Sequence, residues 1–522
     1  MILGEPPNIP ATQQGRRNVA IDEVFRRIAR KHPQQLALID APNREAFTDG
    51  PPRRLTYAEA DHVVWAIAGR LRCMGLPTDA VIGIQLPNIV EGVLTILGVL
   101  RAGMIAAPMP LLWRRADAVA ALSRVGAKAL ITCGHVGGFN HSHLAMRVAS
   151  EVFSIRYVCG FGAKLPDGVV LLGDLFSADR LDPVPPPEGD RLINAAAHLG
   201  LITFETGENG IVPVARNHLE LLAGGVSVAL ESRLAKQDRI LSTIPPSSFA
   251  GISVTLMPWL LSAGTLSLHH PFDADVLAQQ GDSDNCGTLV LPGPVALRLS
   301  EAGAFADRGA ATMLGVWRSP DYLAESSAWR DRAMAFVDVP VFGEAGLIAV
   351  RRDDHGRPAP IPFGPIEMPR GSASAMMAIE VVRTPGSTIA LRGPMVPRQA
   401  FPPGVEHSGL PHLKIDHCGL VDTGYYCRID SLTKAMVIVG PPAGIVSVGG
   451  YRFSLHDLKE AVGRIDSSAT LAALPDPVIG RRLIGNADKR DAIRAALNAV
   501  GVNPIVAAAF RDRSERAEAV RA

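Results

Sequence analysis

Helical and strand-like segments alternate along the chain from Tyr57 to Cys133, and this alternation limits the fold more than any other feature of the sequence. Apolar residues recur at helical spacing in the longer segments, whereas the shorter segments are continuous apolar runs. The expected elements are helix 57–74, strand 81–86, helix 87–100, strand 105–108, helix 116–125 and strand 129–133. Helices that alternate with buried strands over short connections predict a parallel sheet with helices on both faces.

The chain of 522 residues is long enough for several structural units. A proline-rich stretch, 183–187, separates the first unit from the second, and the cluster of glycine and proline at 440–444 gives the clearest domain boundary. The expected domains are a large domain 1–440, with subunits of about 1–182, 183–350 and 351–440, and a small domain 441–522. The predicted fold class is α/β: a large N-terminal part with helix-covered parallel sheets and a β-rich unit, then a small, shortened α+β domain.

Positive and negative side chains are almost equal in number, with 52 lysines and arginines against 51 aspartates and glutamates. This balance argues against a nucleic acid partner. The six cysteines form no CxxC pair, and His407, His412, His417 and Cys418 match no standard zinc spacing. Sparse cysteines and an N-terminus unlike a signal peptide predict a cytoplasmic protein. We expect no membrane span, because charged and glycine residues interrupt the most apolar segment, 93–112.

The first segment that could carry chemistry follows the strand 199–204. We expect a turn there that connects this strand to a helix beginning near His218. The turn contains two hydroxyl residues and two glycines: Thr203, Thr206, Gly207 and Gly210. Backbone N–H groups in such a turn can bind phosphate. A bare turn explains these residues equally well, and Glu205 and Glu208 would repel phosphate.

Three further segments are candidates for a binding site. Phe342 could stack on a base, and Glu344, two residues later, could hold Mg²⁺. A loop glutamate is more often simply solvated. Asp422 could accept hydrogen bonds from ribose hydroxyls, or it could close an Asx-type turn. The glycine pair 449–450 allows the backbone to approach a partner closely.

In their order and spacing, these segments resemble the adenylate-forming superfamily of acyl-CoA synthetases, peptide-synthetase adenylation domains and luciferases. The resemblance covers most of the chain, and it rests on collinear motifs rather than on one specific motif. The matching segments are Leu55-Thr56-Tyr57, 81–103, 392–396, 422–424, 448–453 and 474–480. It implies that a carboxylate attacks the α-phosphate of ATP with Mg²⁺ present. A thiol, commonly that of coenzyme A, then takes the acyl group.

Several charged residues of the family's motifs are missing from this sequence. The segment that resembles the phosphate loop "TSGTTGxPKG" has no lysine, and its one cation is Arg216. Tyr425 stands where "TGD" has its aspartate, and the late catalytic lysine motif is absent. The resemblance implies Glu344 and Arg216 as catalytic residues, with Glu344 also the Mg²⁺ ligand. The implied nucleotide-binding residues are Thr203, Thr206, Gly207, Gly210, Phe342, Gly343 and Asp422.

Two functions follow from this comparison of motifs. The first is an ATP-dependent carboxylate ligase that forms an acyl-adenylate and then an acyl thioester. Its substrate would be a fatty or other apolar acid, because 244–264 resembles the family's acyl pocket, with Phe249 and Gly251 as contacts. An ordinary core helix explains 244–264 equally well. The alternative is a catalytically weakened or inactive relative that binds acyl groups, adenylate or a partner protein. The sequence leaves open a homo-oligomer or a partner subunit.

Overall fold

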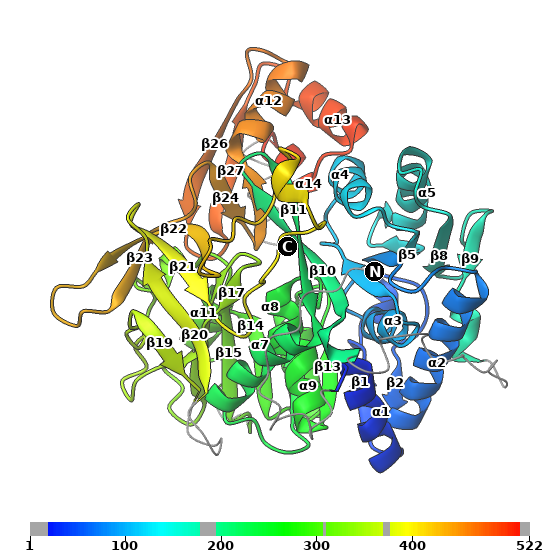
Figure 1. Ribbon diagram of the computed structural model, residues 1–522, viewed down its shortest axis with the longest axis horizontal. Helices are drawn as coiled ribbons and strands as arrows, with labels where there is room; N and C mark the ends of the chain where they lie inside the picture. The colour runs from blue at the N-terminus through cyan, green and yellow to red at the C-terminus, as the bar shows by residue number, and fades with distance from the viewer. Residues whose placement is uncertain (1–18, 178–194, 306–308, 369–375, 512–522) are drawn as a thin grey trace.

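The computed structural model of the chain describes residues 19–177, 195–305, 309–368 and 376–511. Two large sheets lie side by side in Figure 1, the first blue to cyan except for the green strands β10 and β11, and the second mainly green except for the blue strands β1 and β2. A yellow antiparallel sheet lies next to them, and a small C-terminal unit lies above. This arrangement confirms the predicted fold class. The proline-rich stretch 183–187 and the first residues of the chain lie outside the described residues.

The first large sheet has seven strands, and every pair except β10–β11 is parallel. In spatial order the strands are β11 (Gly210–Asn217), β10 (Leu199–Gly207), β4 (Ile105–Pro108), β3 (Val81–Gln85), β5 (Ala129–Cys133), β8 (Tyr157–Phe161) and β9 (Val169–Leu171). The helices that cover it are α2 (Tyr57–Cys73), α3 (Val90–Arg101), α4 (Arg115–Val125) and α5 (His141–Glu151). Helices α2 and α3 belong to one hydrophobic cluster and α4 and α5 to another, so both faces are covered as expected.

The second large sheet has nine strands, parallel at its centre and antiparallel at its edges. Its strands are β17 (Gly346–Leu347), β16 (Ala335–Phe342), β15 (Thr312–Trp317), β14 (Thr288–Pro292), β12 (Arg239–Ser242), β13 (Thr265–Leu268), β1 (Leu36–Ile39) and β2 (Arg54–Thr56), with β18 (Val350–Arg351) beside β16. The other α-helices of the large part, with the π-helix η5, are α1 (Ile21–Lys31), α7 (His218–Glu231), α8 (Phe249–Gly251), η5 (Ile252–Leu256), α9 (Met257–Ser262), α10 (Ala274–Ser283) and α11 (Gly293–Glu301). One hydrophobic cluster includes residues of both sheets, so they share a core.

Two smaller sheets complete the described chain. The antiparallel sheet consists of β19 (Gly364–Glu367), β20 (Met377–Arg383), β21 (Thr388–Arg392), β22 (Val421–Ile429) and β23 (Met436–Gly440). The C-terminal unit contains β24 (Ile445–Val448), β25 (Tyr451–Ser454), β26 (Thr470–Asp476) and β27 (Gly480–Asn486), with α12 (Leu455–Ile465), α13 (Arg490–Val500) and α14 (Pro504–Ala508). Its hydrophobic cluster is separate from the other two. A short ribbon pairs β6 (His135–Val136) with β7 (Phe139–Asn140).

One expectation about local structure is wrong. The segment from Thr203 to His218 is a β-hairpin, in which β10 pairs with β11 from Leu199↔Asn217 to Gly207↔Gly210. The apolar run 211–214 favours an extended strand, and two residues, Glu208 and Asn209, suffice for the connection. The hairpin therefore leaves no open loop between the strand and the helix.

Candidate functional site

A cavity of about 660 Å³ lies between the large part of the chain and the C-terminal sheet. Its walls come from the end of β10, the segments after β12, β15 and β16, the helix α11 and the turn between β24 and β25. Most of its lining is apolar and includes Trp113, Phe204, Val295 and Trp317. The C-terminal unit, orange to red in Figure 1, covers these elements from above.

The carboxylate of Glu205, near the end of β10, meets three N–H groups at this cavity. Oε1 forms an ion pair with Nη1 of Arg452 at 2.6 Å and accepts a hydrogen bond from the backbone N–H of Thr206 at 2.9 Å. Oε2 accepts from the backbone N–H of Glu344 at 2.6 Å. Gly343 permits this approach, because its φ is +59° and a Cβ there would overlap the carboxylate. Since Arg452 is on β25, the ion pair joins the C-terminal unit to the large part.

Glu344 contributes to the cavity wall and Arg216 lies behind it, and each is buried. Oε2 of Glu344 accepts from the N–H of Phe249 at 2.9 Å. Arg216 is on β11 and donates to the carbonyls of Glu344, Ala345 and Met395, with its guanidinium 3.9 Å from the Phe249 ring centroid. Burial raises the pKa of Glu344, and it lowers the pKa of Arg216 to about 10. The Nε and Nη2 donors of Arg216 are thus directed at the protein's own backbone, and its Nη1 is buried without a hydrogen-bond partner among the described residues.

Arg318 follows β15 and lines the cavity. Its Nη2 donates to Oγ of Ser248 at 2.8 Å, and its Nη1 donates to the carbonyl of Gly450 at 3.3 Å. Burial lowers the pKa of Arg318, while the carboxylates of Glu344 and Glu205 act in the opposite direction. Three guanidinium groups and two carboxylates interact here and leave one net positive charge: Arg216, Arg318, Arg452, Glu205 and Glu344.

The predicted site residues do not all meet in this cavity. Among those of the described chain that do line it are Thr206, Gly343 and Glu344. The others lie outside its lining: Thr203, Gly207, Gly210, Arg216, Phe249, Gly251, Phe342 and Asp422. Phe342, expected to stack on a base, is buried with its ring edge-on to Tyr425 at 5.7 Å. Ala250 contributes to the lining between the two predicted substrate contacts, which are themselves buried.

Asp422 is exposed and engaged in a local turn. Its Oδ1 accepts from the N–H of Gly424 at 2.9 Å, and its Oδ2 accepts from the hydroxyl of Thr388 at 3.0 Å. This is the Asx-type turn that the sequence left as the alternative. Tyr425 is fully buried, and burial raises its pKa to about 12. Asp422 lies outside the lining of the cavity, and its role in nucleotide binding stays a prediction.

Sequence reasoning missed Arg318 and Arg452 as functional residues. Arg452 lies in the segment 448–453, where the glycines rather than the charge indicate a binding role. Arg318 belongs to none of the candidate motifs, but it directly follows a buried parallel strand. Ligands commonly bind at the carboxyl ends of parallel strands, so a charged residue at that position was a usable signal.

The residues at the cavity do not fit Mg²⁺ and a triphosphate. Mg²⁺ prefers six oxygen ligands, commonly with one or two carboxylates among them. Here Glu205 is already bound by three N–H donors, and Glu344 accepts from Phe249 next to the Arg216 cation. Within the described parts of the chain, no lysine lines the cavity. The donor set instead suits a single carboxylate or a similar small anion.

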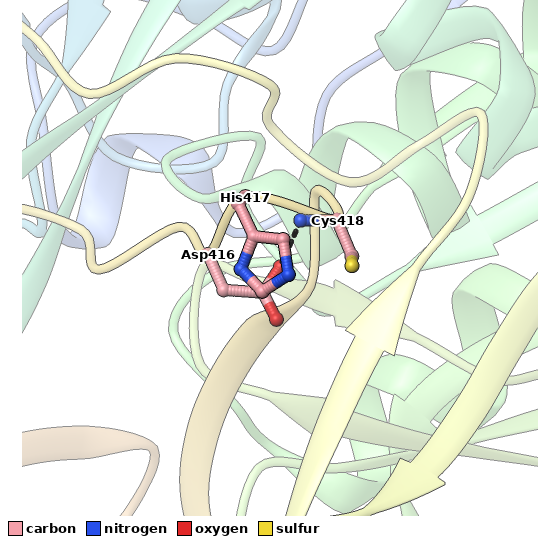
Figure 2. Close-up of side chains that lie close together, drawn as sticks. All are labelled: Asp416, His417 and Cys418. Carbon is pink, nitrogen blue, oxygen red and sulfur yellow. Dashed lines mark hydrogen bonds between the residues drawn. The ribbon is translucent and has the colours of Figure 1, made fainter.

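Asp416, His417 and Cys418 form a second cluster of polar side chains, away from the cavity (Figure 2). All three are exposed, and Oδ1 of Asp416 accepts from the N–H groups of Cys418 and Leu420 at 2.8 Å. These bonds are those of an Asx-type turn, which accounts for the closeness of the three side chains.

Three comparisons place the chain among known proteins. The family model described as "AMP-binding enzyme" matches residues 25–165. A sulfoacetate–CoA ligase of Cupriavidus necator is 25% identical over 443 residues, which is 81% of each chain. Two solved structures share the fold. The amide bond synthetase McbA of Marinactinospora thermotolerans has a TM-score of 0.68 and 17% sequence identity, and the match covers 92% of this chain and 94% of McbA. MbtA of Mycobacterium smegmatis has a TM-score of 0.66 and 18% sequence identity, and the match covers 95% of this chain and 91% of MbtA.

Residues 25–165 match the family of AMP-binding enzymes, and the fold of the chain resembles that of adenylate-forming enzymes. The small C-terminal unit lies next to the large part, with the cavity at their junction. Adenylate-forming enzymes use ATP, and the solved structures that resemble this chain include MatB of Rhodopseudomonas palustris with ATP bound. None of the helices in the described residues is both long enough and apolar enough to cross a bilayer.

Proposed function

We propose that this chain binds a carboxylic acid with an apolar body in the cavity at the C-terminal unit, and that its ATP-dependent activation of the acid is strongly weakened. The observation that carries the proposal is the Glu205 carboxylate. It takes the N–H donors of Thr206 and Glu344 together with the Arg452 guanidinium. These donors lie in the segments that, by resemblance, would bind nucleotide.

Electrostatics oppose a triphosphate at this position. A triphosphate carries several negative charges, and the Glu205 carboxylate would face them at short range. The one net positive charge of the five interacting groups is matched by a single carboxylate instead. Loss of one positioned transition-state donor costs about 10²–10³ in rate. Several such donors are missing, so we expect little acyl-adenylate formation.

The apolar body of the acid would lie against Trp113, Phe204 and Trp317, and its carboxylate would bind Arg318. Apolar walls with a few polar groups are typical of small-molecule sites. A guanidinium can form two parallel hydrogen bonds to a carboxylate. Arg318 is therefore the residue on which affinity for the acid should depend.

Titration calorimetry with a panel of aliphatic and aryl carboxylic acids tests acid binding, and ATP–pyrophosphate exchange on the same panel tests activation. We expect saturable binding of an apolar acid, and exchange close to background. The Arg318→Met variant should bind that acid at least about tenfold more weakly, since a hydrogen bond to a charged group is worth about 1.5–3 kcal/mol. The exposed Arg330→Met serves as the matched control. Absence of binding across the panel, with folded protein, contradicts the proposal.

A second candidate, a fully active acid–thiol ligase with coenzyme A as acceptor, is favoured by one observation. The likeness to the sulfoacetate–CoA ligase extends over 81% of both chains. Robust acid-dependent exchange, followed by thioester formation with coenzyme A, would favour this candidate over the first. A fatty acid substrate, a cytoplasmic location and a homo-oligomer or partner subunit stay predictions from the sequence.

A further inference from the structure

The three donors around Glu205 form a complete anion site. One guanidinium N–H and two backbone N–H groups reach the same carboxylate from two different units, at 2.6 Å, 2.9 Å and 2.6 Å. Backbone donors cannot rotate away when the carboxylate leaves, because β10 and the turn after β16 hold them in place. The site therefore exists as a feature of the fold and not only as a rotamer of Glu205.

The surroundings of the site would favour an anion even more strongly without Glu205. Arg216 and Arg318 also interact with this carboxylate, so its removal raises the local net charge from one positive charge to two. The Nε of Arg452 is buried and has no hydrogen-bond partner among the described residues, so the guanidinium has donor capacity to spare. Space is available too, because Glu205 lines the cavity of about 660 Å³.

We propose that Glu205 is an internal occupant of an anion subsite, which the chain fills with its own carboxylate, and that removal of this side chain allows the subsite to bind a phosphate or carboxylate group. The inference deepens the proposed function and rests on it in one respect, that the cavity is the ligand site. Because the Glu205 carboxylate fills the subsite, a nucleotide phosphate cannot bind there, and this accounts for the weakened use of ATP in the proposed function. The phosphate group could be free or carried by a nucleotide, since the three donors recognise only its oxygens.

The test compares Glu205→Ala with wild type and with Glu208→Ala. Glu208 lies in the turn of the same hairpin and is exposed, so its variant removes the same charge without opening the subsite. Calorimetry with inorganic phosphate, and separately with AMP, is carried out in chloride buffer of matched ionic strength. We expect Glu205→Ala to bind inorganic phosphate at least about tenfold more tightly than either control, because charge-assisted hydrogen bonds replace those of the lost carboxylate.

Two further variants separate the subsite from a general charge effect. Glu205→Gln keeps one oxygen, which can accept from one of the two backbone donors, and fills the same space, so it should not gain phosphate binding despite its lost charge. Glu205→Ala combined with Arg452→Met should lose the gain. Phosphate binding to Glu205→Gln equal to that of Glu205→Ala would mean that charge alone is responsible and would overturn the proposal.

Removal of Glu205 leaves Arg452 without its ion pair, so the alanine variant could fail to fold in chloride. In that case its refolding yield in phosphate decides the matter, because a ligand that binds only the folded state stabilises it by mass action. Rescue by phosphate but not by chloride supports the proposal, and no rescue overturns it. A folded variant without a gain in phosphate binding also overturns it. The binding of apolar acids to the wild type is a separate readout, so failure of the proposed function remains distinguishable.

Discussion

At the scale of single residues, the charges near the cavity are used mainly to hold the protein together. Arg216 is fully buried, packs on the ring of Phe249 and donates to the carbonyls of Glu344, Ala345 and Met395. An arginine expected to bind phosphate would need free donors directed at the cavity. Arg216 instead fixes the turn that carries Glu344, and any influence on a ligand would pass through that turn.

Substitution of Arg216 by methionine should therefore reduce stability rather than affinity alone. It leaves the buried Glu344 carboxylate without a cation that stabilises its charge and three carbonyls without their donor. Breaking a buried charge pair in this way costs about 3–5 kcal/mol. We expect the free energy of unfolding in urea to fall by about that amount.

The matched control is Arg298→Met, which removes an arginine that lines the cavity from α11 but is largely exposed. Its free energy of unfolding should stay close to that of wild type. Similar losses for the two variants would contradict a structural role for Arg216.

At the scale of elements, the start of α7 combines good capping with a buried acid. The side chain of Asn217 accepts from the N–H of Glu220, and Glu220 accepts from the N–H of Asn217. This reciprocal capping box begins the helix directly after the hairpin. Burial raises the pKa of Glu220 to about 7 from its ordinary value of 4.5.

This raised pKa predicts a pH dependence of stability. The folded protein binds the proton of Glu220 more tightly than the unfolded chain, so its free energy of unfolding falls as pH rises from about 4.5 to about 7. Glu220→Gln removes this fall and keeps an oxygen for the cap. The free energy of unfolding of Glu220→Gln minus that of wild type should therefore increase as pH rises across that range, by up to about 3 kcal/mol.

Urea titrations at several pH values measure this difference. Glu59→Gln is the matched control, since Glu59 has the same capping position at the start of α2 and is exposed. Two results would contradict the prediction. One is a difference in free energy of unfolding between Glu220→Gln and wild type that does not change with pH, and the other is the same pH dependence for Glu220→Gln and Glu59→Gln.

At the scale of the whole molecule, polar contacts fix the C-terminal unit to the large part. Besides the Glu205–Arg452 ion pair, two hydrogen bonds join the units here. Arg318 donates to the carbonyl of Gly450, and the hydroxyl of Tyr451 accepts from the N–H of Leu112. On another side of the unit, the N–H of Ala116 in α4 donates to the carbonyl of Gly501, and the Arg115 side chain donates to the carbonyl of Val500. The unit is thus held at two separate places.

Arg452→Met should weaken this attachment, because it leaves the Glu205 carboxylate without its cation at the junction. Both side chains retain some exposure, 13% for Arg452 and 16% for Glu205, so we expect a loss of about 1–3 kcal/mol in the free energy of unfolding. Hydrogen exchange should become faster in β25 and in the tip of the β10–β11 hairpin together.

Arg464→Met provides the control within the same unit. It breaks the pair with Glu460 on α12, in which both side chains are well exposed. Unchanged exchange in the hairpin of Arg452→Met, or equal changes in the two variants, would show that the ion pair does not hold the units together.

The sequence was sufficient for much of the architecture. The alternating segments from Tyr57 to Cys133 appear as α2, α3 and α4 with β3, β4 and β5, because each element depends on local apolar periodicity and on caps a few residues apart. The same local reasoning failed for the Thr203–His218 segment. Both the hairpin and a turn before a helix suit its residues, and pairing with the neighbouring strand decided between them.

The site was less accessible to sequence reasoning. Glu344, Gly343 and Thr206 line the cavity, and their roles in binding stay predictions. The pairing of Glu205 with Arg452 was decided by the tertiary structure, because it depends on how the C-terminal unit docks on the hairpin. Local patterns determine which residues form strands and helices. Which charges meet across a docked interface depends on distances that no spacing along the chain encodes.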